Sequence, residues 1–121
     1  MELQKIIRNY FRIAISEEDR VTIKADGHDY AVIDVGNRGV GIRLTEEDIL
    51  LNKNDNLDVE IMLGANKLHL KGKVAHISID DTGQYLCGIE FIQMDKKSKQ
   101  GLLDYLNQTR RKFFANNSPD E

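Results

Sequence analysis

The sequence predicts a mainly β fold, a six-stranded antiparallel β-barrel followed by one C-terminal α-helix. Short segments that alternate apolar and polar residues, separated by turn sequences, fill the chain up to Met94, after which the apolar spacing becomes helical. The length of 121 residues fits a single domain with one hydrophobic core. We expect the barrel at about residues 18–94, the helix at about 96–114 and a flexible polar tail at 115–121.

The first two strands are expected to form a hairpin. Residues 20–25 (RVTIKA) alternate apolar and polar side chains, which is the period of a half-buried strand. Asp26-Gly27 is a strong turn signal, and residues 30–35 form the returning strand. Both faces of that second strand are partly apolar, so its alternation does not decide which side faces the core.

Four further strands are predicted downstream, at residues 39–44, 57–63, 68–79 and 85–91. In the longest of them, the apolar residues after His76 are out of phase with those before Ala75. A β-bulge near these two residues would account for the slip, because one extra residue moves every following side chain to the other face.

The helix is predicted from a change of period after Met94. Leucines and other residues spaced for one helical face follow, namely Leu102, Leu106, Thr109 and Phe113. Asp95 is a suitable N-cap, since its carboxylate can accept a bond from an N–H group of the first turn. The helix would cover an open end or a side of the barrel.

Composition narrows the classes of protein. A net charge of −3 argues against binding a nucleic acid polymer, which usually needs a broad basic surface. No apolar run approaches the roughly 20 residues that cross a membrane, and the N-terminus lacks the features of a signal peptide. With Cys87 as the one cysteine, no disulfide can form within the chain, and the cytoplasm is the expected location.

Residues suited to catalysis or metal binding are not grouped in the sequence. His28, His69 and His76 do not cluster with Cys87 at any metal-ligand spacing, so we expect neither a metal nor a cofactor. Cys87 shares the inward face of its strand with apolar neighbours and is expected to act as a small buried hydrophobe. Nothing resembles a nucleophile with its base, so we expect no enzyme activity and no catalytic residues.

A first candidate binding motif is RNYFR, residues 8–12, in a segment predicted to be a loop. Arg8 and Arg12 are four residues apart, and each guanidinium can bond phosphate oxygens in pairs or stack on a flat ring. The alternative is a pair of solvated surface arginines.

A second candidate motif is DVGNRG, residues 34–39, between two strands. Its glycines and asparagine also suit an ordinary tight turn, which is the alternative. In the strand that follows, Gly39, Gly41 and Arg43 are expected to face outward. Each glycine weakens a strand by about 0.5–1 kcal/mol, and close approach of a flat ligand is one reason to tolerate that cost.

The two motifs, in this order and separated by a strand, a turn and a strand, resemble the RxxxR and (D/N)xSxxG motifs of PilZ domains. PilZ domains are small bacterial β-barrels that bind cyclic di-GMP, and the resemblance runs from about Arg8 to about Arg110. It implies a cyclic di-GMP receptor that signals through a protein partner.

The resemblance also implies roles for particular residues. Arg8 and Arg12 would clamp the phosphates and contact guanine, and Asp34 would accept bonds from the guanine edge. The other motif residues, Gly36, Asn37 and Gly39, would line the guanine site, with Gly39 as a close-approach glycine. Arg43 lies outside the motifs; its assignment to base or phosphate rests on its outward position alone.

One position departs from the family pattern, because Gly36 stands where the motif has serine. The lost hydroxyl would weaken binding about two- to tenfold if it made one neutral hydrogen bond. The alternative function is therefore a PilZ-like adaptor that contacts proteins and binds no nucleotide. A barrel that binds single-stranded nucleic acid is a third possibility, for which the stacking aromatics and the charge are unsuitable.

Overall fold

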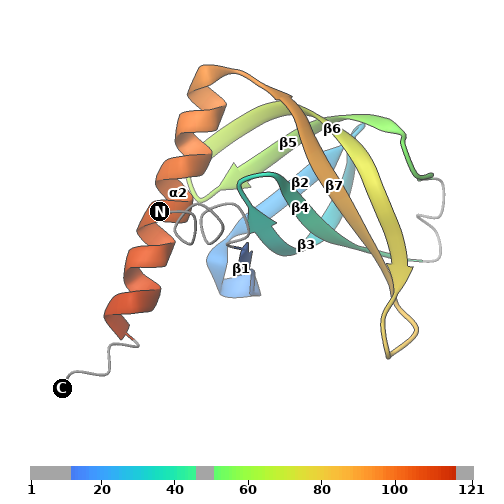
Figure 1. Cartoon of the computed structure of the whole chain (residues 1–121), viewed down its shortest axis with the longest axis horizontal. Coiled ribbons are helices and arrows are strands. Elements are labelled where there is room, and N and C mark those ends of the chain that lie inside the picture. Colours follow the sequence, from blue (N-terminus) through green and yellow to red (C-terminus); the bar gives the residue numbers. More distant parts are fainter. Residues whose placement is uncertain (1–11, 46–50, 117–121) are drawn as a thin grey trace, which may run out of the picture.

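The computed structural model describes residues 12–45 and 51–116. Its elements are seven strands, a short 3-10 helix η1 and one α-helix (Figure 1). In chain order they are β1 (Arg12–Ala14), η1 (Glu17–Asp19), β2 (Val21–Ala25), β3 (His28–Gly36), β4 (Gly39–Leu44), β5 (Asn56–Leu63), β6 (Asn66–Ile79), β7 (Tyr85–Met94) and α2 (Lys96–Asn116).

Six of the strands close into an antiparallel barrel, which confirms the predicted fold. The order of hydrogen-bonded neighbours is β3-β2-β5-β6-β7-β4, and the pairing of β4 with β3 completes the ring. The predicted hairpin between the first two barrel strands is also confirmed. Its turn residues Asp26 and Gly27 both have positive φ angles, 49° and 86°, which is the backbone that a type I′ turn requires.

Strand β1 was not predicted, and the assignment of Arg12 to a loop was wrong. β2 pairs with β3 only between Tyr30 and His28, which leaves the same edge of β3 open further along. β1 occupies that edge, with Arg12 opposite Gly36. Arg8 lies outside the described residues.

The alternating apolar residues of the barrel strands form its core. Those that are at most 4% exposed include Ile23, Ala25, Val35, Val40, Ile42, Leu44, Leu57, Val59, Ile61, Leu63, Leu68, Val74, Cys87 and Ile89. The predicted bulge in β6 is confirmed, because the register with β7 shifts between Val74 and His76. A second bulge, between Val32 and Asp34 of β3, was not predicted, since the apolar pattern of that strand has no clear phase.

Helix α2 begins as predicted, with Asp95 as its N-cap. The Ser98 N–H donates to Asp95 Oδ1 at 2.6 Å, and this bond holds the pKa of Asp95 below its ordinary value. The helix ends at Asn116, two residues beyond the predicted end, and residues 117–121 lie outside the described part.

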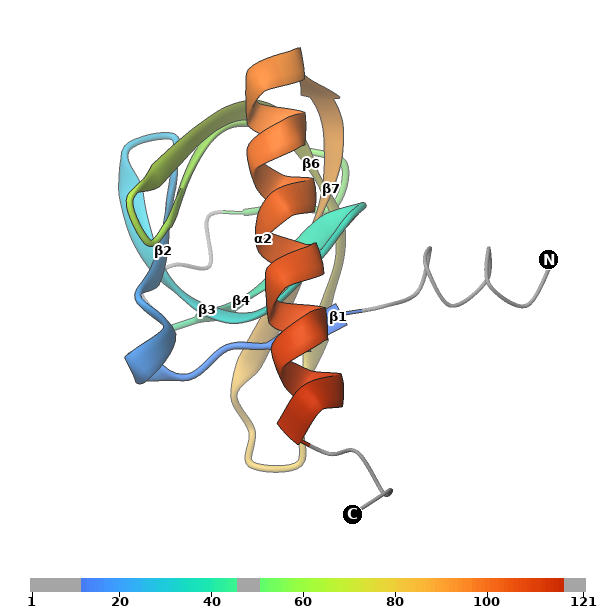
Figure 2. The ribbon, with the colours of Figure 1, turned by 90° about the vertical axis from the view of Figure 1, so that its left-hand side faces the viewer.

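The helix crosses one side of the barrel and contacts β6 (Figures 1 and 2). Leu102 and Leu106 are buried in the core, at 1% and 6% exposure, as their spacing predicts. A Cβ at Gly101 would lie 3.1 Å from Leu68 Cδ2, so the helix backbone approaches β6 closely at this residue. Within the described residues, no helix is both long and apolar enough to span a membrane.

Candidate ligand-binding site

A cavity of about 440 Å³ lies on the outer surface of the barrel, over strands β3, β4, β7 and β6. This volume is in the usual range for small-molecule sites. Its polar and backbone lining includes Arg12, Asp34, Arg38, Gly39, Gly41, His76, Ser78, Gly88 and Glu90. Both predicted motifs therefore contribute to one cavity.

The central polar contact of the cavity is an ion pair between the two motifs. The Arg12 guanidinium donates to Asp34 Oδ1 at 2.7 Å. The two side chains are 43% and 34% exposed, and pairs as exposed as this contribute only about 0.2–1 kcal/mol to stability. The pair holds the guanidinium only weakly, so a ligand can compete with Asp34 for it.

The floor of the cavity is a row of four residues on four neighbouring strands. Asp34 of β3 lies opposite Gly41 of β4, Gly41 lies opposite Gly88 of β7, and Gly88 lies opposite His76 of β6. The two central residues have no side chain, so backbone is the floor between an acidic and an imidazole side chain. A flat ligand ring could approach this backbone more closely than any strand surface that carries side chains.

The glycines of the second motif serve different purposes. Gly39 was predicted to expose the barrel surface, but it is buried, and a Cβ there would overlap the carbonyl oxygen of Ile89. Gly39 is therefore required by the close passage of β7, although it also lines the cavity. Gly41 was predicted to face outward and does so; a Cβ there would lie 2.5 Å from Asp34 Oδ1.

Gly36 and Asn37 are close to the cavity in sequence but are not among its lining residues. Gly36 is buried and pairs with Arg12 between β3 and β1. Asn37 lines a separate cavity of about 420 Å³ beside α2, together with Phe91, Ile92 and Leu103 among others. Its Oδ1 is buried without a hydrogen-bond partner among the described residues.

Arg43 is also not among the residues that line the cavity over β3, β4, β7 and β6. It lies on β4 opposite Leu86, and its guanidinium is 3.6 Å from Asp80 in the β6–β7 turn. Asp80 accepts bonds from the Thr82 hydroxyl and from the backbone of Thr82 and Gln84, and these bonds lower its pKa. Arg43 is therefore held by the hairpin, and its assignment to the ligand remains a prediction.

Four polar residues of the cavity were not predicted from sequence, namely Arg38, His76, Ser78 and Glu90. Arg38 lies inside the second motif, and that position was the available signal for it. The others come from β6 and β7, far along the chain. The predicted bulge in β6 changes the facing of the strand beside His76, but the sequence does not show which strand His76 and Ser78 would then lie beside.

Cys87 contributes to the cavity wall without being a reactive group. The residue is 1% exposed, as predicted, and burial raises the pKa of its thiol to about 11. A thiol with this pKa is a poor nucleophile at neutral pH. In the described part of the chain, no three His, Cys, Asp or Glu side chains are placed to hold a metal ion.

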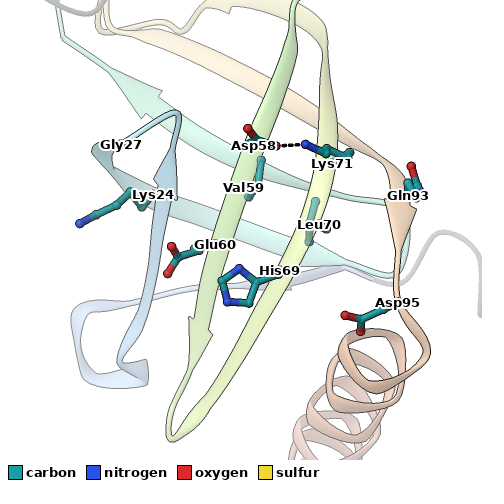
Figure 3. Close-up of a pocket in the computed structure, with 10 residues that line it drawn as sticks. All are labelled: Lys24, Gly27, Asp58, Val59, Glu60, His69, Leu70, Lys71, Gln93 and Asp95. Atoms are coloured by element: carbon teal, nitrogen blue, oxygen red, sulfur yellow. Dashed lines mark hydrogen bonds and ion pairs between the residues drawn. The ribbon is translucent and has the colours of Figure 1, made fainter.

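A second outer cavity, of about 480 Å³, lies over β2, β5 and β6. Figure 3 shows Lys24, Glu60 and His69 on three neighbouring strands, and the contact between Lys71 and Asp58. Lys67 lies 2.9 Å from Glu60, and its hydrogen bond lowers the pKa of that carboxyl. Because acidic and basic side chains alternate and pair here, this surface suits an anionic ligand less well than the cavity over β4 and β7.

The sequence model of the PilZ domain family matches residues 6–108, and the chain belongs to this family. No curated protein matches the chain as a relative. Several solved structures share its fold.

The inhibitor of motility MotI/DgrA of Bacillus subtilis is 16% identical with a TM-score of 0.73, over 87% of this chain and 52% of that one. YcgR of Escherichia coli, solved in complex with c-di-GMP, is 17% identical with a TM-score of 0.68, over 90% and 48%. The chain thus spans about half the length of these two proteins. It covers 98% of a Legionella protein, Lpg0364, at 14% identity and a TM-score of 0.61, over 86% of this chain.

Proposed function

We propose that this PilZ domain is a receptor for cyclic di-GMP, which it binds in the cavity over β3, β4, β7 and β6. The observation that carries the proposal is the Arg12–Asp34 pair, which joins the two family motifs above a glycine floor. The family membership and the c-di-GMP complexes of YcgR from Escherichia coli and MrkH from Klebsiella support it.

The chemistry of the cavity suits a nucleotide with two charged phosphates. Arg12 and Arg38 supply guanidinium groups, which bond phosphate oxygens in a planar, paired geometry. Arg8 would add a third. The Asp34 carboxylate has two oxygens, and the Arg12 bond engages Oδ1, so the other can accept from the N1–H and N2–H edge of guanine.

The signal would pass to a protein partner by contact, because the proposed role is binding rather than catalysis. The partners of the similar solved proteins do not identify this one, since those chains are about twice as long.

The test is a calorimetric titration of the purified domain with cyclic di-GMP, beside GMP and beside Arg12→Ala. We expect saturable heat for the wild type and at least tenfold weaker binding for Arg12→Ala, because a charged hydrogen bond contributes about 1.5–3 kcal/mol. GMP should bind more weakly than cyclic di-GMP, since it offers only one base and one phosphate.

A second candidate is an adaptor that contacts proteins without binding nucleotide. Gly36 favours it, because the family motif has serine at this position. Absence of heat at millimolar cyclic di-GMP, with a folded wild-type domain, would reject the receptor proposal and leave the adaptor.

A further inference from the structure

The far wall of the cavity is a histidine whose ring lies on the glycine floor. A Cβ at Gly88 would overlap His76 Cε1 and lie 2.7 Å and 2.9 Å from its Nδ1 and Nε2. These three atoms of the imidazole ring therefore all lie within 2.9 Å of one point above the Gly88 backbone. Any side chain at residue 88 would displace the imidazole from this position.

The opposite wall is built in the same way. The Asp34 carboxylate leans over Gly41 as the His76 imidazole leans over Gly88, and the two glycines are direct neighbours on β4 and β7. The backbones of Asp34 and His76 are three strand spacings apart, which is about 14 Å. The two polar groups therefore lie over neighbouring glycines and border the same part of the floor from opposite sides.

We propose that His76 is a base-recognition residue, which donates a ring N–H to the Hoogsteen edge of the guanine whose other edge faces Asp34. This inference rests on the proposed function and deepens it. Guanine presents donors, N1–H and N2–H, on one edge and acceptors, O6 and N7, on the other. An acidic wall and an imidazole wall on opposite sides of one floor match that pattern, because a neutral imidazole always has one N–H donor.

The other polar side chains of the cavity are less suited than His76 to donate a hydrogen bond to this edge of guanine. Arg12 is engaged with Asp34 on the first wall, and Arg38 lies in the turn before Gly39. Glu90, opposite Gly39, is an acceptor when ionised and would not bond O6 or N7. Ser78, two residues beyond His76 on β6, lies opposite Leu86 rather than a floor glycine.

The experiment is a calorimetric titration of cyclic di-GMP into the wild type, His76→Ala and His76→Gln. We expect His76→Ala to bind about two- to tenfold more weakly, as for one lost neutral hydrogen bond. His76→Gln should recover most of the affinity, because its amide retains a donor. The matched control is His69→Ala, which removes an exposed histidine of the same strand outside the cavity and should bind as the wild type does.

A second measurement tests the floor beneath the imidazole. Gly88→Ala should weaken binding at least as much as His76→Ala, because its methyl group displaces the imidazole and also covers the glycine floor. Equal binding by wild type and His76→Ala, or no recovery in His76→Gln, would overturn the inference while the receptor proposal stands. A wild type that binds no cyclic di-GMP would reject both.

Discussion

At the scale of the single residue, Gly36 is where this chain departs from the motif of its family. Adding a hydroxyl there should tighten binding of cyclic di-GMP by about two- to tenfold, if it makes one hydrogen bond to the ligand. The comparison is Gly36→Ser against Gly36→Ala, because both add a Cβ to this buried residue and only one adds the hydroxyl. Equal affinities of the two variants in calorimetry would show that the missing serine is not what limits binding.

Two other glycines, Gly39 and Gly101, differ in what a new methyl group would meet. At Gly39 it would overlap the Ile89 carbonyl oxygen, which is backbone and cannot move aside. We expect Gly39→Ala to lower the free energy of unfolding by about 1–3 kcal/mol, measured by urea denaturation. At Gly101 the contact is the tip of Leu68, and alanine favours a helix by about 1 kcal/mol over glycine.

Gly101→Ala should therefore be neutral or slightly stabilising, and it is the control for Gly39→Ala. If Gly39→Ala proves as stable as the wild type, the overlap with β7 is not what requires glycine at this residue. Any loss of ligand binding in that variant would then count as evidence for a direct contact.

At the scale of the element, the start of helix α2 depends on a charged cap. The Ser98 N–H bond lowers the pKa of Asp95, so the ionised carboxylate stabilises the fold at neutral pH. This contribution is present above the ordinary pKa of 3.8 and is lost as the pH falls through the lowered value. We expect Asp95→Ala to be less stable than the wild type at pH 7, and the difference to shrink towards pH 2.

Asp95→Asn is the matched variant for the cap, because asparagine caps a helix about as well as aspartate without titrating. Its stability relative to Asp95→Ala should be nearly independent of pH in urea denaturation. A wild-type advantage over Asp95→Ala that persists unchanged at pH 2 would mean that the carboxylate charge is not responsible.

Strand positions and the helix start could be predicted because they depend on local patterns. The alternation of apolar residues and the Asp26-Gly27 turn are each contained in a few neighbouring residues. Motif order also predicted that the two motifs lie together, and Arg12 and Asp34 do pair and line one cavity. The bulge beside His76 was predicted, but the place of His76 in the cavity was not, because that depends on which strand lies beside β7.

The placements of Arg43 and Asn37 show the same limit. Arg43 faces outward as its strand predicts, yet the side chain that it meets, Asp80, belongs to a distant turn. Asn37 lies in the motif turn, but it points toward the cavity beside α2. The alternation along a strand predicts which side of the sheet a side chain lies on. The residue that it contacts depends on strand register and on the path of the loops, which the alternation does not give.

At the scale of the whole molecule, a ligand that binds only the folded barrel should stabilise all of it. At a free concentration one hundred times its dissociation constant, cyclic di-GMP should add about 2.7 kcal/mol to the free energy of unfolding. We expect a rise in Tm of several degrees in calorimetric scans, and a clearly smaller rise for Arg12→Ala at the same ligand concentration. An unchanged Tm for the wild type at that concentration would contradict binding to the native barrel.

The seam between β4 and β7 has a further consequence, which concerns the time course of folding. It pairs residues that are far apart in the sequence, such as Gly39 with Glu90 and Leu44 with Tyr85. Barrels rich in such distant pairings fold on the order of milliseconds to seconds, because the intervening chain must be ordered before the contacts form. The glycine floor lies across the β4–β7 seam, so the cavity forms only after these two strands have paired and the barrel has closed. A partly folded chain should therefore not bind the ligand.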